Sequence, residues 1–342
     1  MDENPVIWAL IDERPGTGNQ CRAVANSIGL PFIEKHLNWS TFANMPNFFI
    51  GASLRGLTTI SKSGIKSPWP DLVISSGRRA AGAARFIKRK SHGDCGLVHI
   101  MYPGSGATED FDIIAVPNHD GDLKNSGNVI RITGAPHGID AGALSQARVL
   151  WNAKFSKFKK PITALVVGGS TKRHPFTNKM AKELGRQTAD FVLKAGSSLL
   201  VTTSPRTGNS FNFVLEGLFE KNIEPAFVYR WKADGLPGDN PYLGFLANAD
   251  QLIVTGESTT MCSEACAIGN PVHIFAPEGF LGEKHKRLVD ELVSVGYARL
   301  LDSAAGEMAE LRAPKKLDVA GQISKEIRKR ILSNVDTGLY CA

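Results

Sequence analysis

The chain has 342 residues, which exceeds the roughly 250–300 residues at which a single hydrophobic core stops growing, so two lobes are expected. Hydrophobic residues make up 42% and charged residues 21%, as in ordinary globular proteins; no apolar run is long enough to span a membrane, and no signal peptide is predicted, so a cytoplasmic protein is expected. The net charge of +7 favours acidic partners such as nucleotide phosphates or an anionic membrane surface, whereas nucleic acid is not expected because the basic clusters lack interleaved aromatic residues.

The first half of the chain alternates strand-like and helical stretches, which is the pattern of parallel βαβ units. Residues 1–153 are therefore expected to form an N-terminal Rossmann-like lobe, on the side of an acceptor substrate. The predicted strands are 6–11, 71–77, 97–103, 112–117 and 128–134, and the predicted helices lie near 19–28 and 78–90.

The second half restarts the same rhythm. A basic linker is predicted over 154–161, a Rossmann-like donor lobe over 162–310 and a C-terminal basic helix within 311–342. The expected fold class is therefore α/β, with two parallel-sheet lobes that face a central cleft. The predicted strands are 162–170, 198–205, 226–231, 251–257 and 271–277, and the predicted helices are 178–195, 212–221, 259–268 and 317–332.

The loops after strands carry the candidate site, because ligands of parallel sheets bind beyond the carboxyl ends of the strands. In the loop after the strand at 162, Gly168, Gly169 and Ser170 would let the backbone approach a diphosphate, and Lys172 or Arg173 would supply positive charge. The alternative is a tight turn with exposed cations.

A second loop repeats this theme with Ser204 and Arg206, just after the next strand. Alone it would be an ordinary turn. Because neighbouring parallel strands end at one edge, it is expected to point at the same crevice as the first loop.

The third loop is the most informative. Gly256 opens the turn, Ser258 or Thr259 caps a helix, and the helix N-terminus offers N–H donors to an anion. Glu264 follows about a turn and a half into that helix, where a carboxylate could accept both hydroxyls of a ribose. The alternative for Glu264 is a solvated surface glutamate.

In the first half, Asp12 stands at the end of the first strand, where a carboxylate could act as a general base. Its alternative is a turn or capping aspartate. Gly16 and Gly18 are expected to shape the turn into the next helix. The apolar segment 44–57 could bind a lipid surface or form buried core.

No metal site is predicted, because the histidines lack metal-ligand spacing. No cofactor is predicted either. Five cysteines without a repeated CxxC argue against a disulfide framework, and Cys262 and Cys266 are expected to be small buried thiols. The histidines considered are His119, His137, His174 and His285.

These residues resemble a known family. The runs PGTGNQ, VVGGS and TGESTTMCSEACAIGNPVHIF resemble loops of the GT-B glycosyltransferases, particularly the peptidoglycan N-acetylglucosaminyl transferase group. Within that superfamily the chain resembles, over most of its length, the bacterial relatives of the plant mitochondrial-fission factor, the elongated-mitochondria family. The DxRPGxxNQ opening of that family stands here as Asp12, Arg14, Pro15, Gly16, Asn19 and Gln20.

The resemblance implies a GT-B-like fold and a role for each matching residue. Gly168, Gly169 and Ser170 would hold the donor diphosphate with Arg206 nearby; Ser258, Thr259 and Met261 would line the nucleotide pocket, and Glu264 would bind the ribose. The acceptor-side loop would comprise Gly16, Gly18, Asn19 and Gln20.

The transferase group ends its glycine loop with a histidine base, and Gln20 stands at that position here. An amide cannot accept a proton at any useful pH. Either Asp12 replaces the base, or the protein binds its ligand without turning it over.

Three hypotheses follow. The first is a metal-independent transfer of a sugar from a nucleoside diphosphate, expected to be UDP, to an acceptor, with helix 78–90 resting on an anionic membrane if the acceptor is a lipid. The location would then be peripheral, at the inner face of the membrane. The second is a nucleotide-sugar epimerase on the same fold. The third is a non-catalytic adaptor of the fission-factor kind, which keeps a vestigial nucleotide pocket and recruits a protein partner.

Overall fold

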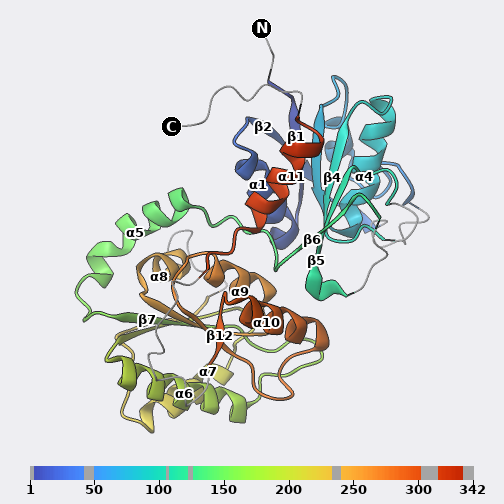
Figure 1. Ribbon diagram of the computed structural model, residues 1–342. Coiled ribbons are helices and arrows are strands. Elements are labelled where there is room, and N and C mark those ends of the chain that lie inside the picture. The colour runs from blue at the N-terminus through green and yellow to red at the C-terminus, as the bar shows by residue number, and fades with distance from the viewer. Residues whose placement is uncertain are drawn as a thin grey trace. The chain divides into compact units, whose positions relative to one another are not determined.

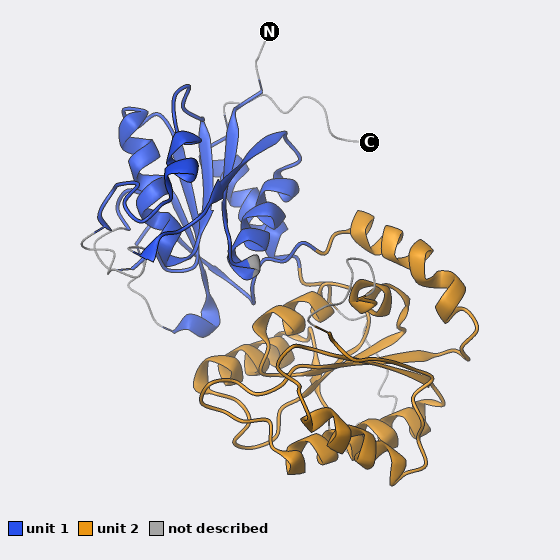
Figure 2. Cartoon of the chain, turned by 180° about the vertical axis from the view of Figure 1, so that it is seen from behind, with its two compact units in different colours: residues 1–138, 318–342 blue, residues 139–317 orange. Residues whose placement is uncertain are grey.

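The computed structural model describes residues 4–41, 50–104, 108–121, 126–232, 240–301 and 315–333. The chain divides into two compact units, each built around its own parallel sheet (Figures 1 and 2). Unit 1 comprises Met1–Gly138 and Asp318–Ala342, and unit 2 comprises Ile139–Leu317. The predicted pair of α/β lobes is confirmed.

Unit 1 contains a six-stranded sheet in the order β2-β1-β3-β4-β5-β6, and its neighbouring strands are all parallel. Its central strands are continuous apolar runs because helices cover both faces of such a sheet. The strands are β1 (Ile7–Asp12), β2 (Phe32–Leu37), β3 (Leu72–Ser76), β4 (Gly96–Ile100), β5 (Ile113–Pro117) and β6 (Val129–Ile132), and the helices are α1 (Pro15–Ile28), α3 (Thr59–Ser63), α4 (Gly77–Lys90), the 3₁₀ turn η2 (Asn118–Asp120) and α11 (Val319–Arg330).

Strand β2 was not predicted from the sequence. It lies at the edge of the sheet, and only Leu37 among its residues is buried. The run FIEKHL is therefore half polar, so it lacks the continuous apolar signal of the interior strands.

The predicted C-terminal helix is present as α11, and it belongs to unit 1. Val319, Ile323 and Ile327 repeat every four residues and are fully buried. The Ser324 hydroxyl lies 3.0 Å from that of Ser27 on α1, and the Arg328 guanidinium donates to the carbonyl of Ile28. The chain therefore returns to its first unit after completing the second.

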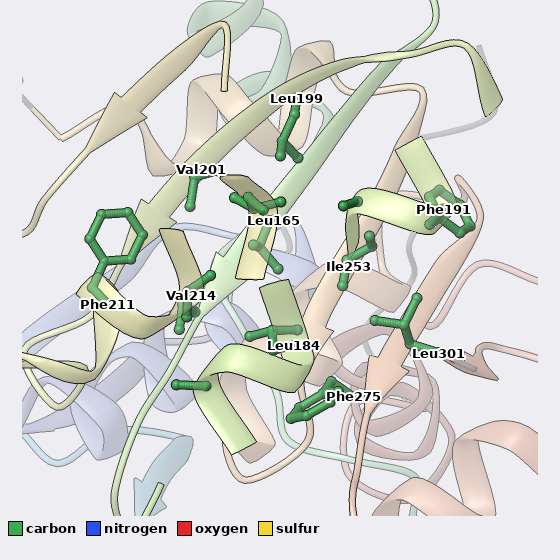
Figure 3. Close-up of a cluster of buried hydrophobic side chains, with 14 of the residues drawn as sticks. Leu165, Leu184, Phe191, Leu199, Val201, Phe211, Val214, Ile253, Phe275 and Leu301 are labelled. Atoms are coloured by element: carbon green, nitrogen blue, oxygen red, sulfur yellow. The ribbon is translucent and has the colours of Figure 1, made fainter. Parts of the chain in front are cut away.

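Unit 2 contains a six-stranded parallel sheet in the order β12-β11-β10-β7-β8-β9. Figure 3 shows part of its core, where Leu165, Val201 and Ile253 of the strands face Leu184 and Val214 of two helices. The strands are β7 (Ile162–Val167), β8 (Ser198–Thr203), β9 (Phe227–Tyr229), β10 (Gln251–Thr255), β11 (Val272–Phe275) and β12 (Arg299–Leu300), and the helices are α5 (Ala141–Phe155), α6 (Asn178–Ala195), α7 (Ser210–Phe219), α8 (Tyr242–Asn248), α9 (Thr259–Cys266) and α10 (Glu283–Val295).

The boundary between the units differs from the predicted linker at 154–161. Phe155 closes helix α5 and is buried, with its ring 5.4 Å from Trp151 and from Phe245 and 5.6 Å from Phe227. This aromatic packing places α5 in unit 2, and the boundary falls at Gly138 instead. Periodicity alone cannot reveal such a contact between distant segments.

Among the described residues no helix is long and apolar enough to cross a membrane. Residues 44–49 of the expected lipid-binding segment lie outside the described residues, while Ile50 and Leu57 are buried. In the basic helix α4, Arg85 and Lys88 form ion pairs with Asp110 and Asp112, at 2.5 Å and 2.7 Å. These carboxylates neutralise part of the charge that a membrane would need, and membrane contact stays a prediction.

Candidate functional site

The loops after β7 and β10 are joined through the backbone of two glycines. The Gly168 N–H donates to the Thr255 hydroxyl at 2.8 Å, and the Gly169 N–H donates to Oε1 of Glu257 at 2.7 Å. Both strands are parallel neighbours, so these contacts lie at the carboxyl edge of the unit 2 sheet.

The loop after β8 joins the same junction. The Ser204 hydroxyl donates to the carbonyl of Gly168 at 2.9 Å, and the Thr207 hydroxyl donates to that of Val167 at 2.9 Å. Nη2 of Arg206 lies 3.3 Å from Oε1 of Glu257. The three loops therefore contact one another, with Glu257 between them, and the shared ligand crevice stays a prediction.

Glycine is required at both positions of the first loop. A Cβ on Gly168 would lie 1.8 Å from Oε1 of Glu257, and a Cβ on Gly169 would lie 2.1 Å from the backbone carbonyl of Arg206. Both distances are far inside van der Waals contact, so any side chain would push the loops apart. The two glycines therefore fit the close approach of neighbouring loops, whatever their part in ligand binding.

Glu257 is a buried acid that the sequence analysis did not single out. Its side chain is fully enclosed, whereas that of Arg206 is 40% exposed. Burial raises the pKa of the Glu257 carboxyl, against the lowering effects of the Gly169 N–H and of Arg206. The one available signal was its position directly after Gly256, where a strand ends.

Glu264 makes its side-chain contact elsewhere, although the sequence predicted that it would share one site with the loops after β7 and β8. It lies on α9 and accepts a hydrogen bond of 2.5 Å from the Tyr242 hydroxyl of α8. Burial raises the pKa of the Glu264 carboxyl to about 7, against the lowering effect of Tyr242. The alternative of a fully solvated surface glutamate is wrong, because the residue is only partly exposed.

Helix α9 begins as the sequence indicates. Ser258 is the N-cap, and its hydroxyl accepts from the N–H of Met261 at 3.4 Å, so Thr259 is the first helical residue. Cys262 and Cys266 face the core and are fully buried, as expected.

The remaining residues of the first loop have separate surroundings. The Ser170 hydroxyl accepts from the N–H of Phe176 at 3.0 Å and so closes the loop. Lys172 and Arg173 are exposed. Within the described residues, no group of three or more His, Cys, Asp or Glu side chains could hold a metal ion.

In unit 1, the Asp12 carboxylate is buried and already accepts three hydrogen bonds. Oδ1 accepts from the Arg14 N–H and from Arg79, both at 2.8 Å, and Oδ2 accepts from the indole N–H of Trp39 at 3.0 Å. The guanidinium of Arg79 also lies over the Trp39 ring, 5.2 Å from its centroid. Asp12 thus ties the ends of β1, β2 and α4 together.

The expected glycine loop of unit 1 is instead the beginning of a helix. Helix α1 starts at Pro15, which suits the first helical turn because its missing N–H would be unpaired there, and so includes Gly16. A Cβ on Gly18 would lie 2.9 Å from the carbonyl of Asp12, so this glycine allows helix and strand to pack closely.

Asn19 and Gln20 lie on the same helix. Oε1 of Gln20 accepts from the Ser76 hydroxyl at 2.7 Å, and Oδ1 of Asn19 accepts from Arg22 at 3.3 Å. Gln20 therefore links α1 to the end of β3.

Comparison with known proteins identifies the relatives of this chain. Residues 15–331 match the family described as Mitochondrial fission ELM1. An uncharacterized protein of Rickettsia prowazekii (strain Madrid E), RP120, is 26% identical over 351 residues, which cover 94% of this chain and 97% of that protein. The resemblance inferred from the opening motif is thereby confirmed.

Solved structures share the fold at low identity. The UDP-GlcNAc 2-epimerase of Methanocaldococcus jannaschii has a TM-score of 0.56 at 13% identity, covering 95% of this chain and 99% of that one. MurG of Acinetobacter baumannii has a TM-score of 0.52 at 12% identity, covering 95% of this chain and 100% of that one. The predicted GT-B-like fold is therefore confirmed.

The contact between Gly168 and Glu257 predicts strong coupling between two substitutions. Gly168→Ala alone should lower the melting temperature because its methyl group overlaps the carboxylate. Glu257→Ala removes that overlap, so the double variant should be more stable than the sum of the single effects by about 1–3 kcal/mol. Gly127→Ala, whose Cβ would meet nothing within 4 Å, is the matched control and should combine additively with Glu257→Ala. Additivity for Gly168→Ala would contradict the packing described.

The raised pKa of Glu264 predicts a pH-dependent stability. A carboxyl whose pKa is higher in the folded than in the unfolded chain stabilises fully below the unfolded value, about 4.3, and loses this contribution as the pH rises through about 7. Glu264→Gln keeps the uncharged form at every pH. The melting temperature of the variant, measured relative to that of wild type, should therefore rise by roughly 2–4 °C when the pH is raised from about 5 to about 8. Glu224 is exposed, so the melting temperature of Glu224→Gln should differ from that of wild type by the same amount at every pH. A constant difference for Glu264→Gln would contradict the raised pKa of Glu264.

Proposed function

The chain belongs to the Mitochondrial fission ELM1 family, and from that premise and the loop junction of unit 2 we propose that it binds a nucleoside diphosphate sugar. One observation carries the proposal. The loops after three adjacent strands, β10, β7 and β8, meet at the contacts among Gly169, Arg206 and Glu257. The carboxyl edge of a parallel sheet is where such folds bind ligands.

The available hydrogen-bond donors define how a diphosphate would bind. The N–H groups of Gly168 and Gly169 bond within the chain, so they hold the loops together. The proposed donors to the phosphates are the half-exposed Arg206 and the exposed Lys172 and Arg173, together with the N-terminus of α9. Cations of this kind bind phosphate oxygens by charge-assisted hydrogen bonds.

Glu264 is proposed to bind the ribose. Tyr242 donates to Oε2, which fixes the direction of the carboxylate, and Oε1 accepts no hydrogen bond within the described parts of the chain. A preoriented acceptor costs little ordering on binding. The nucleotide would lie between Glu264 and Met261, on the exposed side of α9, with UDP as the expected nucleotide.

The catalytic form of this proposal is a metal-independent sugar transfer in which Asp12 takes the proton of the acceptor hydroxyl. An epimerase is the alternative, and one solved structure of the same fold is a UDP-GlcNAc 2-epimerase. Either reaction needs an accessible base. Asp12 would have to exchange a hydrogen bond with Arg14, Arg79 or Trp39 before it could act.

That arrangement favours a second candidate function, a non-catalytic adaptor that binds the nucleotide sugar and recruits a protein partner. The carboxylate of Asp12 serves there as a clamp between strands. Gln20, an amide bonded to Ser76, supplies no base in its place.

Ligand binding is tested by thermal denaturation with UDP-GlcNAc, GDP-mannose and TDP-glucose. A ligand at 100 times its Kd should stabilise the folded chain by about 2.7 kcal/mol, so at least one sugar nucleotide should raise the melting temperature by several degrees. Arg206→Ala and Glu264→Ala should each remove most of the shift, while the exposed Lys179→Ala should retain it. No shift with any of the three ligands would contradict the proposal.

Turnover is tested by following UDP release and sugar isomers from UDP-GlcNAc with wild type and Asp12→Asn. If Asp12 is the base, its removal should slow the reaction about 100-fold or more. Glu13→Gln is the matched control, because Glu13 lies 3.3 Å from the same arginine but is 46% exposed. Binding without any product, unchanged in Asp12→Asn, would favour the non-catalytic candidate over the epimerase.

A further inference from the structure

A fourth segment reaches the loop junction of unit 2, namely the start of helix α10. Its N-cap is Gly282, which has no side chain to cap the helix. A Cβ on Gly282 would lie 2.9 Å from Nε2 of His174, so the imidazole of His174 rests against this helix end. His174 itself comes from the loop after β7, where the Thr171 hydroxyl accepts from its N–H at 3.2 Å.

His285 lies in the first turn of α10, three residues after Gly282. Its pKa is lowered, first by burial and then by the positive charges of Lys284, Arg206 and His174. Across the junction, the negative group facing Arg206 is the enclosed Glu257. The loops after β7 and β8 and the start of α10 therefore bring two imidazoles and the cations Arg206 and Lys284 within electrostatic range of one another.

Neither His174 nor His285 makes a side-chain hydrogen bond or ion pair within the described residues. Burial and, after it, the neighbouring positive charges favour the neutral form of His285. An added anion with two negative charges would oppose this preference, because opposite charge within a few ångströms favours the protonated imidazole.

We propose that His285, supported by His174, forms part of the phosphate end of this site and takes up a proton from solution when a nucleoside diphosphate sugar binds. The inference rests on the proposed function of unit 2. The protonated imidazole donates a hydrogen bond to a phosphate oxygen, and no covalent bond changes. Arg206 is already charged and paired with Glu257 in the free chain. The charge on His285, by contrast, forms only when the ligand binds.

The test uses isothermal titration of the full chain with UDP-GlcNAc, whose two phosphates are both esterified and carry no group that titrates near neutral pH. At about pH 7, the binding enthalpy should depend linearly on the ionisation enthalpy of the buffer. Because Glu264, with its pKa of about 7, can also exchange a proton on binding, the expected result is a proton uptake larger for wild type than for His285→Gln by up to one proton. Affinity should increase as the pH falls from about 8 to about 6.

Two substitutions isolate His285. His285→Gln should bind about tenfold more weakly than wild type at about pH 6 and nearly equally at about pH 8, with a proton uptake lower than that of wild type. His285→Arg carries a permanent charge and should keep high affinity at both pH values, again with a proton uptake lower than that of wild type. His92→Asn replaces an exposed histidine in the turn after α4 and should behave as wild type.

The outcomes are distinct. Absence of UDP-GlcNAc binding, with melting curves that show a folded wild type, contradicts the proposed function for this ligand and the inference with it. Binding with equal proton uptake by wild type and His285→Gln overturns the inference alone. Equal weakening of His285→Gln at both pH values also overturns it, because a purely structural role would not depend on the charge of the imidazole.

Discussion

The enclosed carboxylate of Glu257 is the constraint around which unit 2 arranges its carboxyl edge. Burying an acid is costly unless it is paired and hydrogen-bonded, and here the Gly169 N–H and the Arg206 guanidinium supply partners. The acid fits only because Gly168 has no side chain, and the Arg206 backbone approaches closely only because Gly169 has none. Glu257, together with the hydroxyls of Thr255, Ser204 and Thr207, holds three loops that are far apart in the sequence in one arrangement.

Around this junction, some polar groups are hydrogen-bonded within the chain and others remain exposed. The Gly169 N–H and Nη2 of Arg206 are committed to Glu257, and the Gly168 N–H is committed to Thr255, while the Arg206 side chain stays 40% exposed. Cationic and imidazole side chains gather outside the buried acid.

Unit 1 uses the same device with a different result. Asp12 stands at the end of β1, as Glu257 follows β10, and it is likewise surrounded by an arginine and a backbone N–H. The indole of Trp39 adds a third donor. A carboxylate with its acceptor positions occupied clamps strands firmly, and the same bonds oppose a role as a free base.

Much of this protein could be predicted from its sequence. Buried parallel strands such as β1 and β7 are continuous apolar runs, and glycines and hydroxyl residues directly after strands indicate the loops of a site, because both signals are local. Tertiary structure alone decided that Glu257 occupies the loop junction, that Glu264 bonds to Tyr242, and that α11 returns to unit 1. Each of these depends on contacts between segments distant in the chain, which hydrophobic periodicity does not encode.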